Sequence, residues 1–142
     1  MAEHNDIGAI GEEIAAKTFR RKWLRIRERN WRCGHLEVDI IAESRKEIIF
    51  AEVKTRTGTW GGKTPAEYVD DAKKRHMVAA ANAYVRQHGI EKYVRLDVVG
   101  VLLDAETHEA VEVTHYENAF LPPVRTVGNE TPPSNRRAPR KW

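Results

Sequence analysis

The chain has 142 residues, 41% hydrophobic and 32% charged, the composition of one globular domain with a charge-rich surface. It has no apolar run of about 18 residues and no signal-peptide pattern at its start, so we expect no membrane-spanning helix and a cytoplasmic location. Its single cysteine, Cys33, excludes an internal disulfide.

The net charge is +3, but the basic residues are concentrated in two places. Residues 121–142 hold five basic residues and one acidic residue. The segment from Lys17 to Arg32 holds eight basic residues against Glu28 alone. Such a patch suits a polyanion, and a solvated helix end with an edge strand explains it equally well. The candidate phosphate contacts in this patch are Arg21, Arg29 and Arg32.

The first predicted element is a helix over residues 5–22, capped by Asn5 or Asp6. Its apolar side chains form a stripe at helical spacing that should face the core: Ile7, Ile10 and Ile14. Gly8 and Gly11 are unfavourable inside a helix and indicate that a neighbouring backbone approaches closely.

Three strands should follow, over residues 24–32, 36–42 and 48–56. The turns between them are short, which predicts an antiparallel meander. The first strand is rich in arginine, as is typical of an edge strand. Residues 55–65 contain three glycines and should form a loop that contacts substrate.

A second helix is predicted from Thr64-Pro65 to His88, with Gly89 ending it. The apolar run 93–103 predicts a strand covered on both faces and joined in parallel through that helix. A last short strand covers 111–115.

The predicted order is therefore α-β-β-β-α-β-β, an α/β (α+β) domain with one mixed sheet and helices packed against it. We expect this domain to span residues 1–120. The remainder, 121–142, is basic and proline-rich, and the composition predicts a disordered tail.

Charged residues in the second and third strands form the candidate site. Glu52 and Lys54 are two residues apart on a strand, so they share a face with the apolar Ile48 and Phe50. Burying a carboxylate and an ammonium is costly unless they are paired or bind metal. Asp39 lies on the neighbouring strand, so the three groups can form one cluster.

This cluster suits the hydrolysis of phosphodiester bonds. Asp39 and Glu52 would hold Mg²⁺ or Mn²⁺, which prefer carboxylate, water and phosphate oxygens. Lys54 would orient the attacking water and stabilise the transition-state charge. Glu37 shares the face of Asp39 and is an additional ligand candidate. The alternative, of equal weight from the pattern alone, is a structural salt bridge of Lys54 with Glu52 and Asp39.

Other residue types add less. Helical spacing alone leaves Glu12 between a surface position and a semi-buried one, and it favours a solvated side chain. Three tryptophans are candidates for base stacking, although tryptophan more often packs in the core or at its rim: Trp23, Trp31 and Trp60. Of these, Trp60 in the glycine loop is preferred. Four histidines lack the spacing of a zinc site, and the last of them is interpreted as a strand-end residue: His35, His76, His88 and His115.

Five segments then carry a resemblance to a known family: Gly8-Ala-Ile-Gly11-Glu12, Arg29-Asn30-Trp31-Arg32, Glu37-Val-Asp39-Ile-Ile-Ala42, Phe50-Ala-Glu52-Val-Lys54-Thr-Arg56 and Asn118-Ala-Phe120. In this order they resemble the YraN-like family of small, largely uncharacterised bacterial proteins. That family is similar to Holliday-junction resolvases and to the PD-(D/E)xK nuclease superfamily. The chain departs from the family at Leu36, where glycine is usual, and at Lys74, where glutamine is expected.

The resemblance implies a restriction-endonuclease-like fold and a Mg²⁺- or Mn²⁺-dependent endonuclease acting on DNA rather than RNA, including branched or damaged DNA. It matches Asp39, Glu52 and Lys54 to catalytic positions, and it makes Glu12 a catalytic acid that supports the metal. Arg56 and Lys73 are further candidate nucleic-acid contacts. Junction cutting would favour a homodimer. The alternative is a non-catalytic nucleic-acid-binding or assembly module with the same fold.

Overall fold

The computed structural model describes the backbone of residues 3–120 and the side chains from Asp6 onward. The predicted tail, 121–142, and the boundary of the domain therefore lie outside the described residues. The elements are α1 (Glu3–Arg21), β1 (Arg25–Cys33), β2 (Leu36–Glu43), β3 (Glu47–Thr57), the 3₁₀ helix η1 (Pro65–Tyr68), α2 (Asp71–His88), β4 (Tyr93–Leu103) and β5 (Ala110–Tyr116). The predicted mixed α/β order is confirmed.

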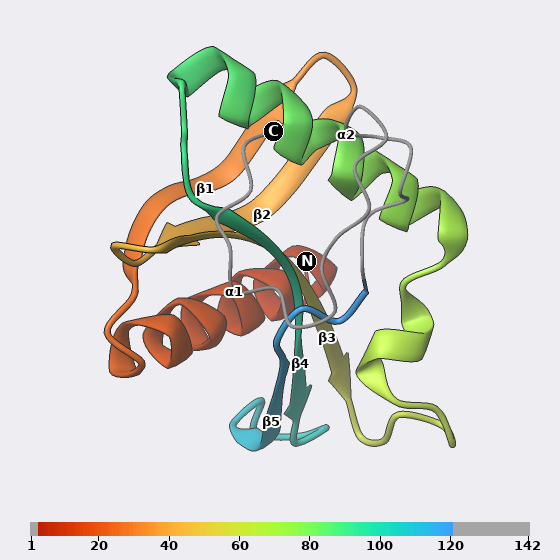
Figure 1. Ribbon diagram of the computed structural model, residues 1–142. Helices are drawn as coiled ribbons and strands as arrows, with labels where there is room; N and C mark the ends of the chain where they lie inside the picture. The colour runs from red at the N-terminus through yellow and green to blue at the C-terminus, as the bar shows by residue number, and fades with distance from the viewer. Residues whose placement is uncertain (1–2, 121–142) are drawn as a thin grey trace.

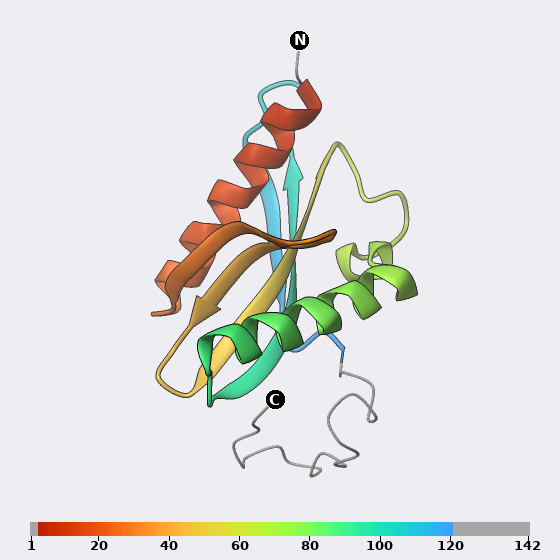
Figure 2. The ribbon, with the colours of Figure 1, turned by 90° about the horizontal axis from the view of Figure 1, so that it is seen from above.

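The five strands form one sheet in the order β1-β2-β3-β4-β5. The pairs β1–β2, β2–β3 and β4–β5 are antiparallel, and β3–β4 is parallel, with α2 making the crossover. The arginine-rich β1 is an edge strand, as predicted. The two helices cover opposite faces of the sheet, as the two ribbon views show (Figure 1, Figure 2).

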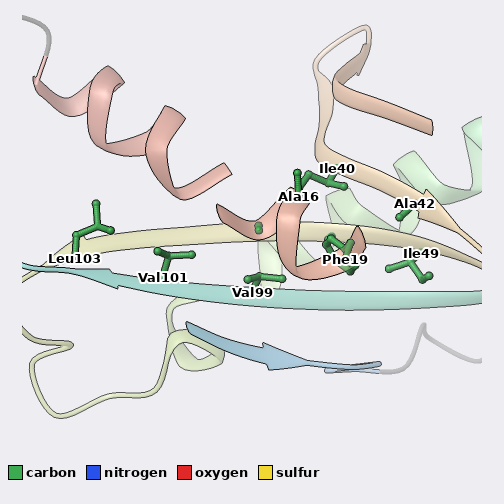
Figure 3. Close-up of a cluster of buried hydrophobic side chains, with 10 residues drawn as sticks. Ala16, Phe19, Ile40, Ala42, Ile49, Val99, Val101 and Leu103 are labelled. Atoms are coloured by element: carbon green, nitrogen blue, oxygen red, sulfur yellow. The ribbon is translucent and has the colours of Figure 1, made fainter. Parts of the chain in front are cut away.

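Alternation along β3 divides the core into two layers. Ile49 and Ala51 face α1, whose apolar stripe packs over them together with Phe19 (Figure 3). Ile48 and Phe50 face α2 and pack there with Tyr84. Because side chains alternate in this way, the residues that follow Phe50 at every second position also belong on the α2 face.

The contact of α1 with β3 explains one of the two helix glycines. A Cβ atom on Gly11 would lie 1.9 Å from the Thr55 hydroxyl oxygen, so only glycine fits there. Nothing lies within 4 Å of the corresponding point on Gly8, and the prediction of a close approach there is wrong. The predicted caps were also wrong: Asn5 and Asp6 lie inside the helix, which begins at Glu3.

The single helix predicted from Thr64 to His88 is in fact two elements. Thr64 caps η1 in a capping box with Glu67, and Val69 is extended and buried. Asp70 then caps α2 through its carboxylate, which accepts from the Lys73 N–H at 2.8 Å. Asp70 is the signal in the sequence for this second helix start, since aspartate is a strong N-capping residue.

The sheet divides where β2 leaves β3. Their paired residues end at Ile40 opposite Ala51, whereas β1–β2 pairing continues to the hairpin tip and β3–β4 pairing continues to Thr57. The tip of the β1–β2 hairpin turns toward α2 (Figure 1). There the rings of His35 and His76 meet edge-on, with centroids 5.7 Å apart. The candidate site lies at this division.

Candidate metal and phosphate site

Asp39 is the first residue of β2 beyond the segment that pairs with β3, which ends at Ile40. Its Oδ2 accepts the Val53 N–H at 2.8 Å. A side chain thus replaces the backbone partner that β2 would supply if the two strands continued together. The carboxylate is fixed at the division of the sheet and half-buried.

Glu52, one residue before Val53, lies on the α2 face, as the alternation predicts. It is only 7% exposed. Two ammonium groups approach its carboxylate: Lys54 Nζ at 3.5 Å from Oε2 and Lys73 Nζ at 3.4 Å from Oε1. The structure therefore joins the predicted Glu52–Lys54 pair to Lys73 of α2, which the sequence had suggested only as a nucleic-acid contact.

Asp39 has an unusual electrostatic environment. Burial raises its pKa, and the neighbouring Glu52 carboxylate raises it further, to about 7 from an ordinary value of 3.8. The Val53 hydrogen bond and the Lys73 charge lower the pKa, but they do not offset the other effects. The ionised form of Asp39 is thus disfavoured by more than the Val53 N–H and the Lys73 ammonium offset.

Glu12 contributes to the same field from the other face of the sheet. It is half-buried on α1, next to the glycine that packs on β3, and its charge also raises the pKa of Asp39. Spacing alone favours a solvated side chain and leaves a semi-buried one open, whereas the resemblance implies a place near the site. Within residues 6–120, no three His, Cys, Asp or Glu side chains gather closely enough to hold a metal ion by themselves.

The arginines predicted to bind phosphate differ in their surroundings. Arg29 pairs with Glu13 at 2.9 Å, and Arg32 pairs with Glu37 at 3.8 Å. The additional ligand candidate Glu37 thus already has a cationic partner. Arg21 is exposed in the last turn of α1.

The glycine loop packs onto the sheet. A Cβ atom on Gly100 of β4 would lie 3.3 Å from the Trp60 ring and 2.3 Å from Pro65. Tyr68 donates its hydroxyl to the Trp60 carbonyl, and the Arg56 guanidinium lies 5.2 Å from the Tyr68 ring centroid. Trp60, the tryptophan preferred for stacking, is therefore half-buried against the sheet, and Arg56 is held near the same cluster.

Sequence reasoning missed a buried network on β4 and β5. Asp97 is fully buried and accepts hydrogen bonds from Arg95, from His115 Nε2 at 2.6 Å and from the Asn118 N–H at 2.8 Å. Burial raises the pKa of Asp97, but the hydrogen bonds from His115 and Arg95 more than offset this and hold it below its ordinary value. A lone aspartate inside an apolar run was the available signal, since a buried carboxylate needs partners.

The fold and the site define a class: a mixed α/β domain in which carboxylates and lysines converge where two strands of the sheet separate. The model of the uncharacterised protein family UPF0102 matches residues 11–101, and the chain belongs to that family. This confirms the YraN-like assignment.

The chain also aligns with individual members of this family over nearly their whole length. A UPF0102 protein of Phocaeicola vulgatus is 44% identical over 87% of this chain and 99% of its own. One from Porphyromonas gingivalis is 40% identical over 96% and 99%, and one from Caldanaerobacter subterraneus is 37% identical over 80% and 93%. No helix among residues 3–120 is long and apolar enough to cross a membrane.

Proposed function

We propose that this protein is a cytoplasmic Mg²⁺- or Mn²⁺-dependent endonuclease that hydrolyses phosphodiester bonds in DNA, including branched or damaged DNA. One observation carries the proposal. Asp39 and Glu52 lie on adjacent strands at the point where those strands separate, and two lysines lie within 3.5 Å of Glu52. Carboxylates and ammonium groups together can hold a cation and the phosphate that it binds.

The donor set fits magnesium. Asp39 and Glu52 would hold the ion through carboxylate oxygens, with Glu12 supporting the site from α1. Magnesium commonly uses one or two protein carboxylates, with waters and phosphate oxygens completing its shell. A bound divalent ion would polarise the phosphate and lower the pKa of a bound water.

The lysines supply positive charge on the α2 side of the site. Lys54 and Lys73 are each about one-third exposed, so their ammonium groups can also reach a phosphate at the surface. We assign Lys54 to the attacking water and to the charge that develops on the phosphate. Lys73 holds Glu52 in place and adds to the same field. Arg56, at the exposed end of β3, is a candidate contact to the adjacent phosphates.

Substrate and assembly follow from this proposal. Arg21, Arg29 and Arg32 would contact the DNA backbone beyond the site. Cutting both strands of a junction would require two copies of the site, so a two-fold homodimer belongs to the proposal.

The test is a cleavage assay on branched, single-stranded and duplex DNA with Mg²⁺ or Mn²⁺. Asp39→Asn, Glu52→Gln and Lys54→Met should each reduce cleavage by at least about 100-fold, the effect of removing one transition-state contact. Glu112→Gln, an exposed acid on β5, is the matched control and should cut normally. Wild-type rates in the three site variants would refute the assignment of the site.

A second candidate is a nucleic-acid-binding module without catalysis. The observation that favours it is the pairing of Glu52 with two lysines, which resembles a structural salt bridge. This candidate predicts salt-sensitive DNA binding that persists in EDTA and in Glu52→Gln. Calorimetric titration of Mg²⁺ and Mn²⁺ into wild type and Glu52→Gln separates the two, because only the nuclease should bind the ion through Glu52.

A further inference from the structure

Trp23, immediately after α1, has two unusual properties. It is 91% exposed, whereas the other exposed large hydrophobic residues, Val111 and Val113, are 62% and 39% exposed. Its backbone lies in the left-handed region, with φ of 67°. Bulky residues rarely adopt this conformation, because Cβ clashes with the backbone.

The local hydrogen bonds show why the backbone adopts it. The Leu24 N–H donates to the Phe19 carbonyl at 3.1 Å, and the Trp23 N–H donates to the Arg20 carbonyl at 3.0 Å. This is the Schellman ending of a helix, in which the left-handed position is usually glycine. Leu24 and Phe19 both belong to the α1 layer of the core, so the chain must turn here.

The second helix provides an internal comparison. α2 ends with Gly89 in the same left-handed conformation, with φ of 60°, and the Ile90 N–H donates to the Val85 carbonyl at 3.1 Å. The protein thus uses glycine at one helix end and tryptophan at the other. Neither packing nor backbone preference explains a tryptophan at this position, and such strain is typical of functional positions.

The charges around Trp23 indicate what its ring binds. The last turn of α1 and the start of β1 place basic residues on both sides of it in the chain, all of them exposed: Arg20, Arg21, Lys22 and Arg25. Lys22 and Arg25 have acidic partners in Glu117 and Glu43. A flat exposed ring among cations matches a polyanion that also presents aromatic faces, because bases stack on tryptophan while phosphates contact arginine.

We propose that Trp23 is a stacking platform for an unpaired base, and that the nucleic acid bound by this protein carries a single-stranded segment that crosses the C-terminal end of α1. The inference deepens the proposed function and rests on it in requiring a nucleic-acid partner. Duplex bases are stacked on each other and cannot reach the ring, so the platform selects single strands, flaps or open junctions.

The distance along α1 sets the length of that segment. Nine positions of helix lead from Glu12 to Arg21, the last residue of α1, which corresponds to about 14 Å at roughly 1.5 Å per residue. A stacked strand advances about 3.4 Å per nucleotide, so about four nucleotides span this interval. A stacked oligonucleotide shorter than this should not reach from Glu12 to the platform.

The test is the fluorescence anisotropy of a labelled 15-nucleotide oligothymidine and of a blunt duplex of equal length, in EDTA so that no cleavage occurs. Trp23→Gly removes the ring and suits the left-handed backbone, while Trp23→Tyr keeps an aromatic face. We expect Trp23→Gly to bind the single strand about 5- to 100-fold more weakly, and Trp23→Tyr to bind within about threefold of wild type. Duplex binding should be unchanged in both.

The salt dependence separates stacking from charge. Trp23→Gly keeps every basic residue, so the slope of log affinity against log salt should equal that of wild type. A urea unfolding curve for each variant checks the fold, and Trp23→Gly should be at least as stable as wild type.

Each outcome decides the inference. Equal single-strand binding by wild type and Trp23→Gly overturns it, as does absence of single-strand binding by wild type. Loss of binding to anionic phosphatidylserine vesicles in Trp23→Gly, with the oligonucleotide unaffected, also overturns it in favour of a lipid surface. Ring-dependent binding without any cleavage in Mg²⁺ would support the platform and refute the nuclease, whereas cleavage with ring-independent binding would do the reverse.

Discussion

Asp39 and Asp97 are the same residue type on the same sheet, and they lie in opposite environments. Asp97 is fully buried, yet its pKa is lowered, because Arg95, His115 and the Asn118 N–H all donate to its carboxylate. Asp39 is half-buried. Its pKa is raised to about 7, first because of burial and then because the neighbouring carboxylates oppose its charge, and the Val53 N–H offsets only part of this.

The difference separates structure from function. The protein supplies Asp97 with its own cation and donors, so that carboxylate is complete within the fold and joins β4 to β5. The negative charge around Asp39 is left partly uncompensated, although compensation would stabilise the folded state. Groups kept in such a state are candidates for binding or catalysis, and the proposed function would complete this one with a cation from solution.

The largest expected effect concerns the stability of the Asp97 network. Asp97→Ala leaves His115 Nε2 buried without its acceptor and leaves Arg95 with Glu47 and Glu117 alone. We therefore expect the free energy of unfolding to fall by about 3–5 kcal/mol. Asp39→Asn should not lower it at pH 7, because it removes a charge that the fold does not compensate. Urea unfolding at pH 7 measures both. A comparable loss in the two variants would contradict the distinction between them.

The second effect is stabilisation by divalent ions. A ligand that binds only the folded state raises its stability, by about 2.7 kcal/mol when present at 100 times its dissociation constant. Thermal unfolding with and without Mg²⁺ or Mn²⁺ should show this increment in wild type and lose it in Asp39→Asn and Glu52→Gln. Asp97→Asn should keep the increment despite its lower stability. An increment retained by Asp39→Asn would place ion binding elsewhere.

The third effect is a pH dependence of opposite sign at the two positions. The folded pKa of Asp39 is raised from 3.8 to about 7, so its contribution to stability is complete below about pH 4 and is lost as the pH rises to about 7. The pKa of Asp97 is lowered, so its contribution is present above about pH 4 and is lost as the pH falls through the folded value.

Urea unfolding at pH 5, 6, 7 and 8 tests the Asp39 half of this prediction. Between pH 5 and 7 the difference between wild type and Asp39→Asn should shift by at least about 1 kcal/mol in favour of the variant. Parallel curves for the two proteins over this range would show that Asp39 titrates as an ordinary carboxylate.

Local pattern was enough to predict most of the fold. The β3 alternation placed Ile48, Phe50 and Glu52 on one buried face, and the apolar run of β4 indicated a strand covered on both sides. The predictions that were wrong concern contacts with residues distant in sequence. Gly8 and Gly11 are equivalent in a helical pattern, but only Gly11 meets Thr55. Helical periodicity also does not reveal that Val69 is extended and separates η1 from α2.

The candidate site divides in the same way. Glu52 and Lys54 follow from strand geometry, but the approach of Lys73 depends on how α2 crosses the sheet, which no local pattern encodes. Trp60 and Trp23 are both stacking candidates in the sequence, and Trp60 is preferred there because of its glycine loop. The position of Gly100 beneath Trp60 made one of them a packing residue, and the turn after α1 left the other exposed.

The smallest effect tests how Lys73 moderates the charge at Asp39. The Lys73 ammonium lies 3.4 Å from Glu52 and lowers the pKa of Asp39. Lys73→Met should therefore raise the pKa of Asp39 further, by less than about one pH unit, as followed by NMR titration of the side-chain carboxyl carbon. Lys74→Met is the matched control, since the Lys74 ammonium lies 5.5 Å from the Phe120 ring centroid. An equal shift in both variants would mean that the whole basic start of α2, rather than the contact of Lys73 with Glu52, sets the field at the division of the sheet.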